Sequence, residues 1–148
     1  QHADFLAAQL KLLAPFAGDF EYIGSPASLQ EKVDFYHSID LLSVPTDFLE
    51  PKGLYILEAW ANGLPVVQPA HGAFPESLGF SGSGRLVPPR DPQALAAALA
   101  ELADPELRGE LGRRGRHAVE DEHANPVAAD KTRELLSRLL KESAPEPH

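Results

Sequence analysis

The chain has 148 residues, of which 43% are apolar and 24% charged, and its formal net charge is −9. This length fits one domain rather than two, and the acidic balance disfavours general binding to nucleic acid or anionic membranes. The absence of cysteine excludes disulfides, thiolate metal sites and cysteine nucleophiles. No apolar run approaches the ~18 residues of a membrane span and no signal peptide is recognised, so we expect no membrane span and a cytoplasmic location.

Charge is unevenly distributed along the chain. Residues 1–84 hold three basic residues against ten acidic ones, whereas residues 85–148 hold ten basic and twelve acidic residues, including all eight arginines. The chain begins with glutamine and contains no methionine, from which we expect a piece of a longer protein.

Hydrophobic spacing and helix-boundary residues predict alternating helices and strands. The predicted helices and strands of the first part cover residues 3–14 (helix), 20–24 (strand), 28–38 (helix) and 41–44 (strand). Those of the middle part cover residues 54–62 (helix), 65–68 (strand), 73–78 (helix) and 85–87 (strand). Three helices over residues 94–103, 107–119 and 127–140 complete the set, and a flexible tail is expected over residues 142–148.

Two kinds of local signal support these helix boundaries. Ser28 and Glu31 have the spacing of a capping box. Each of the last three helices begins with a capping residue followed by proline, at Asp91, Asp104 and Asn125. The order of strands and helices predicts an α/β fold with a parallel sheet and flanking helices. Such sheets bind ligands at the carboxyl ends of their strands.

The loop after the strand at 41–44 carries the strongest functional pattern. Glu50 and Glu58 are separated by seven residues, and Gly53 immediately precedes a helix. A helix N-terminus attracts phosphate, and a glycine there permits close approach. The carboxylates would repel phosphate but can accept hydrogen bonds from hydroxyls, so the pattern suits a ligand with sugar, diphosphate and ribose in a row. A solvated position at the surface, without a ligand, is an alternative explanation for both glutamates. Glu58 fits this explanation less well, because it lies in a helix expected to be largely buried, where an unpaired carboxylate is costly.

This stretch resembles the nucleotide-binding half of retaining glycosyltransferases with the GT-B fold (family 4, "group 1"). Their signature is a Glu-x7-Glu motif within Pro-Ser…Glu-Gly-Phe-Gly…Leu-Glu-Ala-x-Ala-x-Gly-x-Pro-Val-Val. The resemblance continues through residues 71–76, 84–89, 91–96 and 104–108, in order. It implies that residues 1–141 form a Rossmann-like, C-terminal donor-binding domain. The implied reaction transfers a hexose from a nucleotide sugar to an unidentified acceptor with retention of configuration, without a metal or other cofactor.

The resemblance also assigns roles to individual residues. Glu50 matches the catalytic glutamate near the reacting carbon of the donor sugar, and Glu58 matches the glutamate that holds the ribose diol. Gly53 and Leu54 match positions whose backbone amides face the diphosphate or the sugar. The remaining donor-binding candidates are Lys52, Gly24, Ser25 and His71.

Two of these candidates have an alternative explanation that fits equally well. The family's Glu-Gly-Phe-Gly is Glu-Pro-Lys-Gly here, which places Lys52 beside the expected diphosphate, but an exposed lysine needs no ligand to explain it. His71 lies in the loop after a predicted strand and lines the site in one interpretation, and is a turn residue beside Gly72 in the other.

The resemblance further implies parts that would precede residue 1. These are the first two strands of the sheet, the Arg and Lys that clamp the diphosphate, and an N-terminal acceptor domain. We therefore expect the isolated chain to be inactive and to expose sheet edges that favour a homodimer or strand exchange. Two alternatives remain open: a non-catalytic nucleotide-sugar-binding or self-associating module of the same fold, and a nucleotide-sugar epimerase, which the paired glutamates disfavour.

Overall fold

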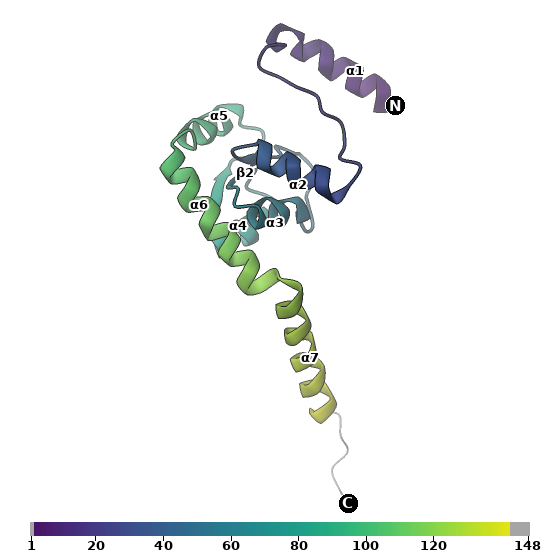
Figure 1. Cartoon of the computed structure of the whole chain (residues 1–148). Helices are drawn as coiled ribbons and strands as arrows, with labels where there is room; N and C mark the ends of the chain where they lie inside the picture. The colour runs from purple at the N-terminus through teal and green to yellow at the C-terminus, as the bar shows by residue number, and fades with distance from the viewer. Residues whose placement is uncertain (1, 143–148) are drawn as a thin grey trace, which may run out of the picture. The chain divides into compact units, whose positions relative to one another are not determined.

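A computed structural model describes residues 2–142 of the chain (Figure 1). Residues 143–148, most of the predicted flexible tail, lie outside the described residues. The chain divides into two compact units, residues 1–32 and residues 33–148, and each unit is described by itself. Within residues 2–142 no helix is long and apolar enough to cross a membrane.

The first unit contains one long helix and an extended segment. Helix α1, His2–Leu13, is followed by a short 3₁₀ turn, Ala14–Phe16, that contains Pro15. The predicted strand over residues 20–24 is wrong, because this segment has no regular secondary structure and the side chain of Ile23 is 57% exposed. A strand needs a hydrogen-bonded neighbour, and no described strand pairs with this segment.

Helix α2, Leu29–Ser38, begins at the predicted capping box. The Glu31 amide donates to Ser28 Oγ at 3.1 Å, and Glu31 Oε2 accepts from the amide of Ala27 at 2.7 Å. The side chain of Glu31 thus reaches one residue further back than in the standard box. Tyr36 of this helix is buried.

The second unit is built on a parallel three-stranded sheet in the order β1-β2-β3, which confirms the predicted α/β fold. The strands are β1 (Leu42–Ser43), β2 (Val66–Pro69) and β3 (Gly84–Val87). Leu42 pairs with Val66, and Val66 pairs with Gly84. Helices α3 (Leu54–Ala61), α4 (Phe74–Ser81) and α5 (Pro92–Glu101) each follow one of the strands.

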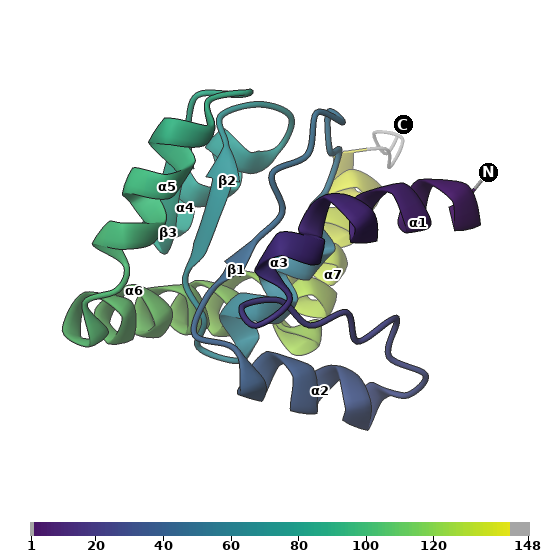
Figure 2. The ribbon, with the colours of Figure 1, turned by 90° about the horizontal axis from the view of Figure 1, so that it is seen from above.

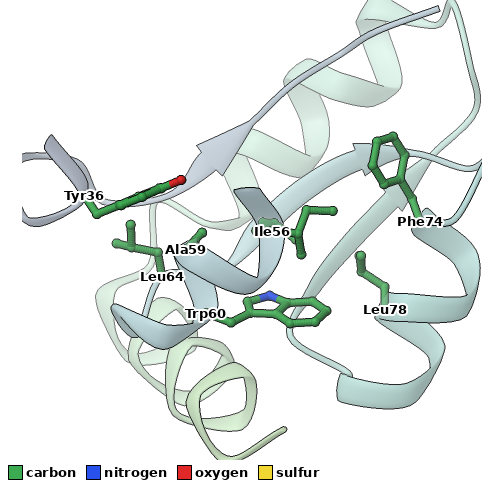
Figure 3. Close-up of a cluster of buried hydrophobic side chains, with 8 residues drawn as sticks. Tyr36, Ile56, Ala59, Trp60, Leu64, Phe74 and Leu78 are labelled. Carbon is green, nitrogen blue, oxygen red and sulfur yellow. The ribbon is translucent and has the colours of Figure 1, made fainter. Parts of the chain in front are cut away.

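The sheet separates two apolar clusters, because successive residues of β2 point to opposite faces. Val66 joins the cluster formed with α2, α3 and α4, which is shown in Figure 3. Val67 joins the cluster formed with β3, α5 and α6. Helices therefore flank both faces of the sheet, with α3 and α5 on opposite sides in Figure 2.

Three helical segments complete the chain: α6 (Pro105–Ala118), a π-helical turn (Val119–His123) and α7 (Asn125–Glu142). The predicted caps of α5 and α6 form, since the carboxylates of Asp91 and Asp104 each accept a backbone N–H at 2.9 Å. The third predicted cap, the side chain of Asn125, lies outside the described residues. Trp60 Nε1 donates to Ser83 O at 3.1 Å, and Ser83 Oγ donates to Leu111 O at 2.7 Å. The buried residue that precedes β3 thus joins α3 to α6.

Candidate active site

Four of the predicted site residues of the second unit lie in the loops that follow β1 and β2, and the other two, Leu54 and Glu58, lie in α3. The pairing of β1 with β2 ends at Ser43 and Val67. At this end the two strands are also joined by hydrogen bonds that involve side chains. Ser43 Oγ donates to Val67 O at 2.9 Å, and the amide of Val44 donates to Gln68 Oε1 at 3.3 Å. Gln68 is fully buried. These two hydrogen bonds hold the start of the loop after β1 to β2, at the edge where ligands bind in sheets of this type.

Glu50 folds back onto the start of α3. Its Oε1 accepts from the amides of Lys52 at 3.1 Å and Gly53 at 3.0 Å. Gly53 has φ 63°, a left-handed conformation that favours glycine. The predicted contact between the Gly53 amide and a diphosphate would therefore require the Glu50 carboxylate to move first. Leu54 is 60% exposed at the first position of α3, where a helix leaves its backbone N–H without an intrahelical partner.

The loop after β2 makes two hydrogen bonds to residues 44–53, which connect β1 to α3 and are called the Glu50 loop. His71 Nε2 donates to Thr46 O at 2.8 Å, since the carbonyl can only accept. The Ala73 amide donates to Glu50 O at 2.8 Å. Between them, Gly72 has φ 57°, and a Cβ built there would lie 2.7 Å from Glu50 O. The hydrogen bond that the structure gives His71 is thus to the protein backbone, and its predicted contact with a donor stays a prediction.

Glu58 lies in the middle of α3 and is partly buried, as predicted from its apolar neighbours. Tyr36 donates its hydroxyl proton to Glu58 Oε2 at 2.9 Å. Burial, the hydrogen bond to Glu58 and the charge of Glu58 together raise the pKa of Tyr36 well above its usual value, with burial the largest cause. Burial and the charge of Glu50 likewise raise the pKa of Tyr55. Both glutamates therefore act on tyrosines that the sequence pattern did not single out.

The other predicted site residues are less constrained. Lys52 is exposed, which fits either of its two explanations. Gly24, with φ 73°, and Ser25 belong to the first unit, so their part in the site stays a prediction. Among residues 2–142, no group of three or more His, Asp or Glu side chains is arranged to hold a metal ion.

A pocket of about 290 Å³ opens between the loops after β1 and β3. Its rim carries an ion pair between Asp47 and Arg90, with 3.2 Å between Oδ1 and Nε. Arg90 has φ 60°, a conformation that is uncommon for a residue with a side chain. Sequence reasoning missed Arg90 and this pocket. The remaining lining residues are Pro45, Thr46, Pro69, Val87, Pro88, Asp91, Pro92 and Leu95.

Residues 4–104 match the family model described as "Glycosyl transferases group 1". That match covers more than half of the chain. The chain belongs to the group 1 glycosyltransferases.

Curated relatives carry the same family's activity in their names. A D-inositol 3-phosphate glycosyltransferase from Saccharomonospora viridis is 36% identical over 119 residues, which is 80% of this chain and 26% of that protein. A protein of the same name from Corynebacterium jeikeium is 34% identical over 125 residues, which is 84% of this chain and 28% of that protein. The chain thus spans about a quarter of the length of these relatives.

Solved structures agree with this assignment. The C-terminal domain of a group 1 glycosyl transferase from Francisella tularensis superposes with a TM-score of 0.71 at 27% identity, covering 82% of this chain and 64% of that chain. A sucrose-phosphate synthase from Thermosynechococcus elongatus gives a TM-score of 0.75 at 30% identity, covering 90% of this chain and 34% of that chain. The Rossmann-like half of a GT-B glycosyltransferase is therefore the confirmed fold.

Proposed function

We propose that this chain is the donor-binding part of a retaining hexosyltransferase whose donor is a nucleotide sugar. Family membership supports sugar transfer. The observation that carries the finer proposal is the position of Glu50 and Glu58, one before and one within the first helix that follows a strand end, with Gly53 between them. In this proposal Glu58 accepts hydrogen bonds from the ribose diol, and Glu50 accepts them from a hydroxyl of the donor sugar.

The positive end of α3 would meet the diphosphate in this arrangement. The first amides of a helix carry a partial positive charge that favours an anion, and Lys52 beside them would add a full one. The Glu50 carboxylate that accepts from Gly53 has to turn towards the sugar for this to happen. Donor binding would then move Glu50 from its structural hydrogen bonds to its reactive position.

Transfer itself would replace the nucleoside diphosphate at the anomeric carbon by the hydroxyl oxygen of an acceptor, on the same face of the sugar. We propose that the acceptor is held by a separate N-terminal domain, since the chain spans only 26% and 28% of the length of the two curated relatives above. Catalysis would then require the longer protein, while donor binding would be a property of this chain.

Glu50→Gln in the longer protein tests the proposal. The glutamine retains an Oε1 that can accept from the Lys52 and Gly53 amides, so the fold should be unchanged. It lacks the negative charge, so transfer of labelled sugar from the nucleotide sugar should fall to background. A thermal unfolding midpoint equal to that of the wild type is the control. Wild-type transfer rates in the variant would remove Glu50 from the reaction.

The alternative function is a module of the same fold that binds a nucleotide sugar or another copy of itself without catalysis. The exposed apolar side chains of α1 and α7, among them Phe5 at 66% and Leu136 at 54% exposure, favour self-association. Nucleotide-sugar binding by a longer protein that transfers nothing to any acceptor would support this alternative.

A further inference from the structure

We propose that Tyr36 is a positioning residue of the donor site, whose hydroxyl fixes the Glu58 carboxylate in the orientation that receives the ribose. This inference rests on the proposed function, because the contact between Glu58 and ribose is itself part of that proposal. Tyr36 does not touch the donor in this arrangement and acts only through Glu58.

The ring of Tyr36 has little freedom to move. It is 5% exposed and belongs to the apolar cluster that also contains Ala59 and Leu64 (Figure 3). The ring of Phe35 lies beside it, with 5.5 Å between the ring centroids. Side chains in a packed interior keep one position. The hydroxyl of Tyr36 is consequently held at a fixed point beside α3.

This hydroxyl has one proton and two acceptors within reach. Glu58 Oε2 lies at 2.9 Å and the carbonyl oxygen of Tyr55 at 3.4 Å. The shorter bond to a charged oxygen is the stronger one. The hydroxyl therefore donates its hydrogen bond chiefly to Glu58. This bond connects the long, flexible glutamate side chain to a ring that does not move. Such preorganisation lowers the entropy that a ligand has to remove when it binds.

The position of Glu58 on α3 suits this role. Glu58 follows Leu54 by four residues, so the two lie on the same side of the helix. Leu54 is the first residue of α3, where the diphosphate is proposed to bind. A carboxylate one turn further along that side would meet the next group of the nucleotide, the ribose, provided that its side chain does not fold away. The hydrogen bond from Tyr36 prevents such folding.

The test compares ribonucleotides with analogues that lack the diol. UDP, GDP and ADP, and their 2′,3′-dideoxy counterparts, are titrated into the chain by calorimetry or by ligand-observed NMR. We expect the best ribonucleotide to bind about tenfold more tightly than its dideoxy counterpart, the ratio typical of a hydrogen bond to a charged group. Tyr36→Phe should reduce this ratio severalfold by weakening the ribonucleotide, and should leave dideoxy binding unchanged.

The control variant is Leu102→Val. Leu102 is fully buried in the apolar cluster on the other face of the sheet, so the variant loses stability without touching Glu58. Its ratio should equal that of the wild type. Tyr36→Phe removes a single oxygen from a packed ring, and a cooperative thermal transition confirms that it folds.

The outcomes separate the two proposals. A wild-type chain that binds nucleotides but does not distinguish them from dideoxy analogues refutes the contact between Glu58 and ribose, and the role of Tyr36 with it. A wild-type chain that distinguishes them, with the same ratio in Tyr36→Phe, refutes only the role of Tyr36. Equal weakening of both ligands in Tyr36→Phe assigns Tyr36 a purely structural function and also overturns the inference.

Discussion

Gly72 is the most tightly constrained residue of the candidate site. Its φ of 57° is strained for other residues, and a Cβ there would lie 2.7 Å and 2.8 Å from backbone atoms of Glu50. Gly72→Ala should therefore lower the free energy of unfolding by about 1–3 kcal/mol and displace the Glu50 loop. Urea unfolding measures the loss.

Gly79→Ala is the matched control for this change. Gly79 lies inside α4, and nothing lies within 4 Å of a Cβ built there. Alanine should stabilise the helix by up to about 1 kcal/mol because it restricts the unfolded chain. Equal effects of the two substitutions would show that the close contact at Gly72 is absent in solution.

The raised pKa of Tyr36 predicts a loss of stability in alkali. Burial and Glu58 keep the Tyr36 phenol protonated in the folded chain at a pH where it ionises in the unfolded chain. Its stabilising contribution is thus complete below about pH 10, the ordinary pKa of tyrosine, and is lost as the pH rises towards the folded pKa. Urea unfolding between pH 8 and pH 11 should show a steeper decline for the wild type than for Tyr36→Phe. Parallel curves would contradict the raised pKa.

Some residues of the site could be predicted from the sequence and others could not. The spacing of Glu50 and Glu58 and the glycine before the helix are visible in a linear pattern. The hydrogen bonds of Tyr36 and Gln68 are not, because they join residues more than 20 positions apart or depend on the exact point where two strands diverge. The apolar pattern of α2 does not single out Tyr36, and it says nothing about the partner of its hydroxyl.

At the scale of elements, α6 depends on two glycines, one facing α3 and one facing Gly63 just after α3. A Cβ on Gly112 would overlap the carbonyl oxygen of Gly63, and one on Gly115 would lie 2.6 Å from Trp60 Cδ1. Gly115→Ala should therefore destabilise the chain by about 1–3 kcal/mol through overpacking. Gly109→Ala, in the same helix, would meet only the end of the flexible Arg113 side chain at 3.4 Å, and should be neutral or stabilising. Thermal unfolding of the two variants tests this expectation, and similar unfolding midpoints would show that Gly115 is not packed against Trp60.

The helices and the three strands of the sheet were predicted well because most of their signals are local. Capping residues and apolar spacing are contained within each element, and the caps at Asp91 and Asp104 form as expected. The segment over residues 20–24 has the composition of a strand, but strand formation depends on a pairing partner from elsewhere in the fold. The sequence of the segment alone does not supply that information.

At the scale of the whole molecule, the chain has its own core but leaves many large apolar side chains in contact with water. Leu135, Leu136 and Leu139 of α7 are 47%, 54% and 46% exposed. The three-stranded sheet also has two outer strands, β1 and β3. Exposed apolar faces and strand edges both favour association. These features are the ones on which the expectation of a homodimer from the sequence rests.

Static light scattering tests this expectation directly. The mass of the wild-type chain should rise above 16.0 kDa with increasing concentration. Replacing Leu135 and Leu139 with glutamate should keep the mass at the monomer value, because burying two charges in an apolar contact is costly. Ser137→Glu adds charge to α7 without removing an apolar side chain, and its association should be weakened much less. A wild-type mass that stays at the monomer value at millimolar concentration would show that these apolar side chains tolerate water, and that the chain is stable without a partner.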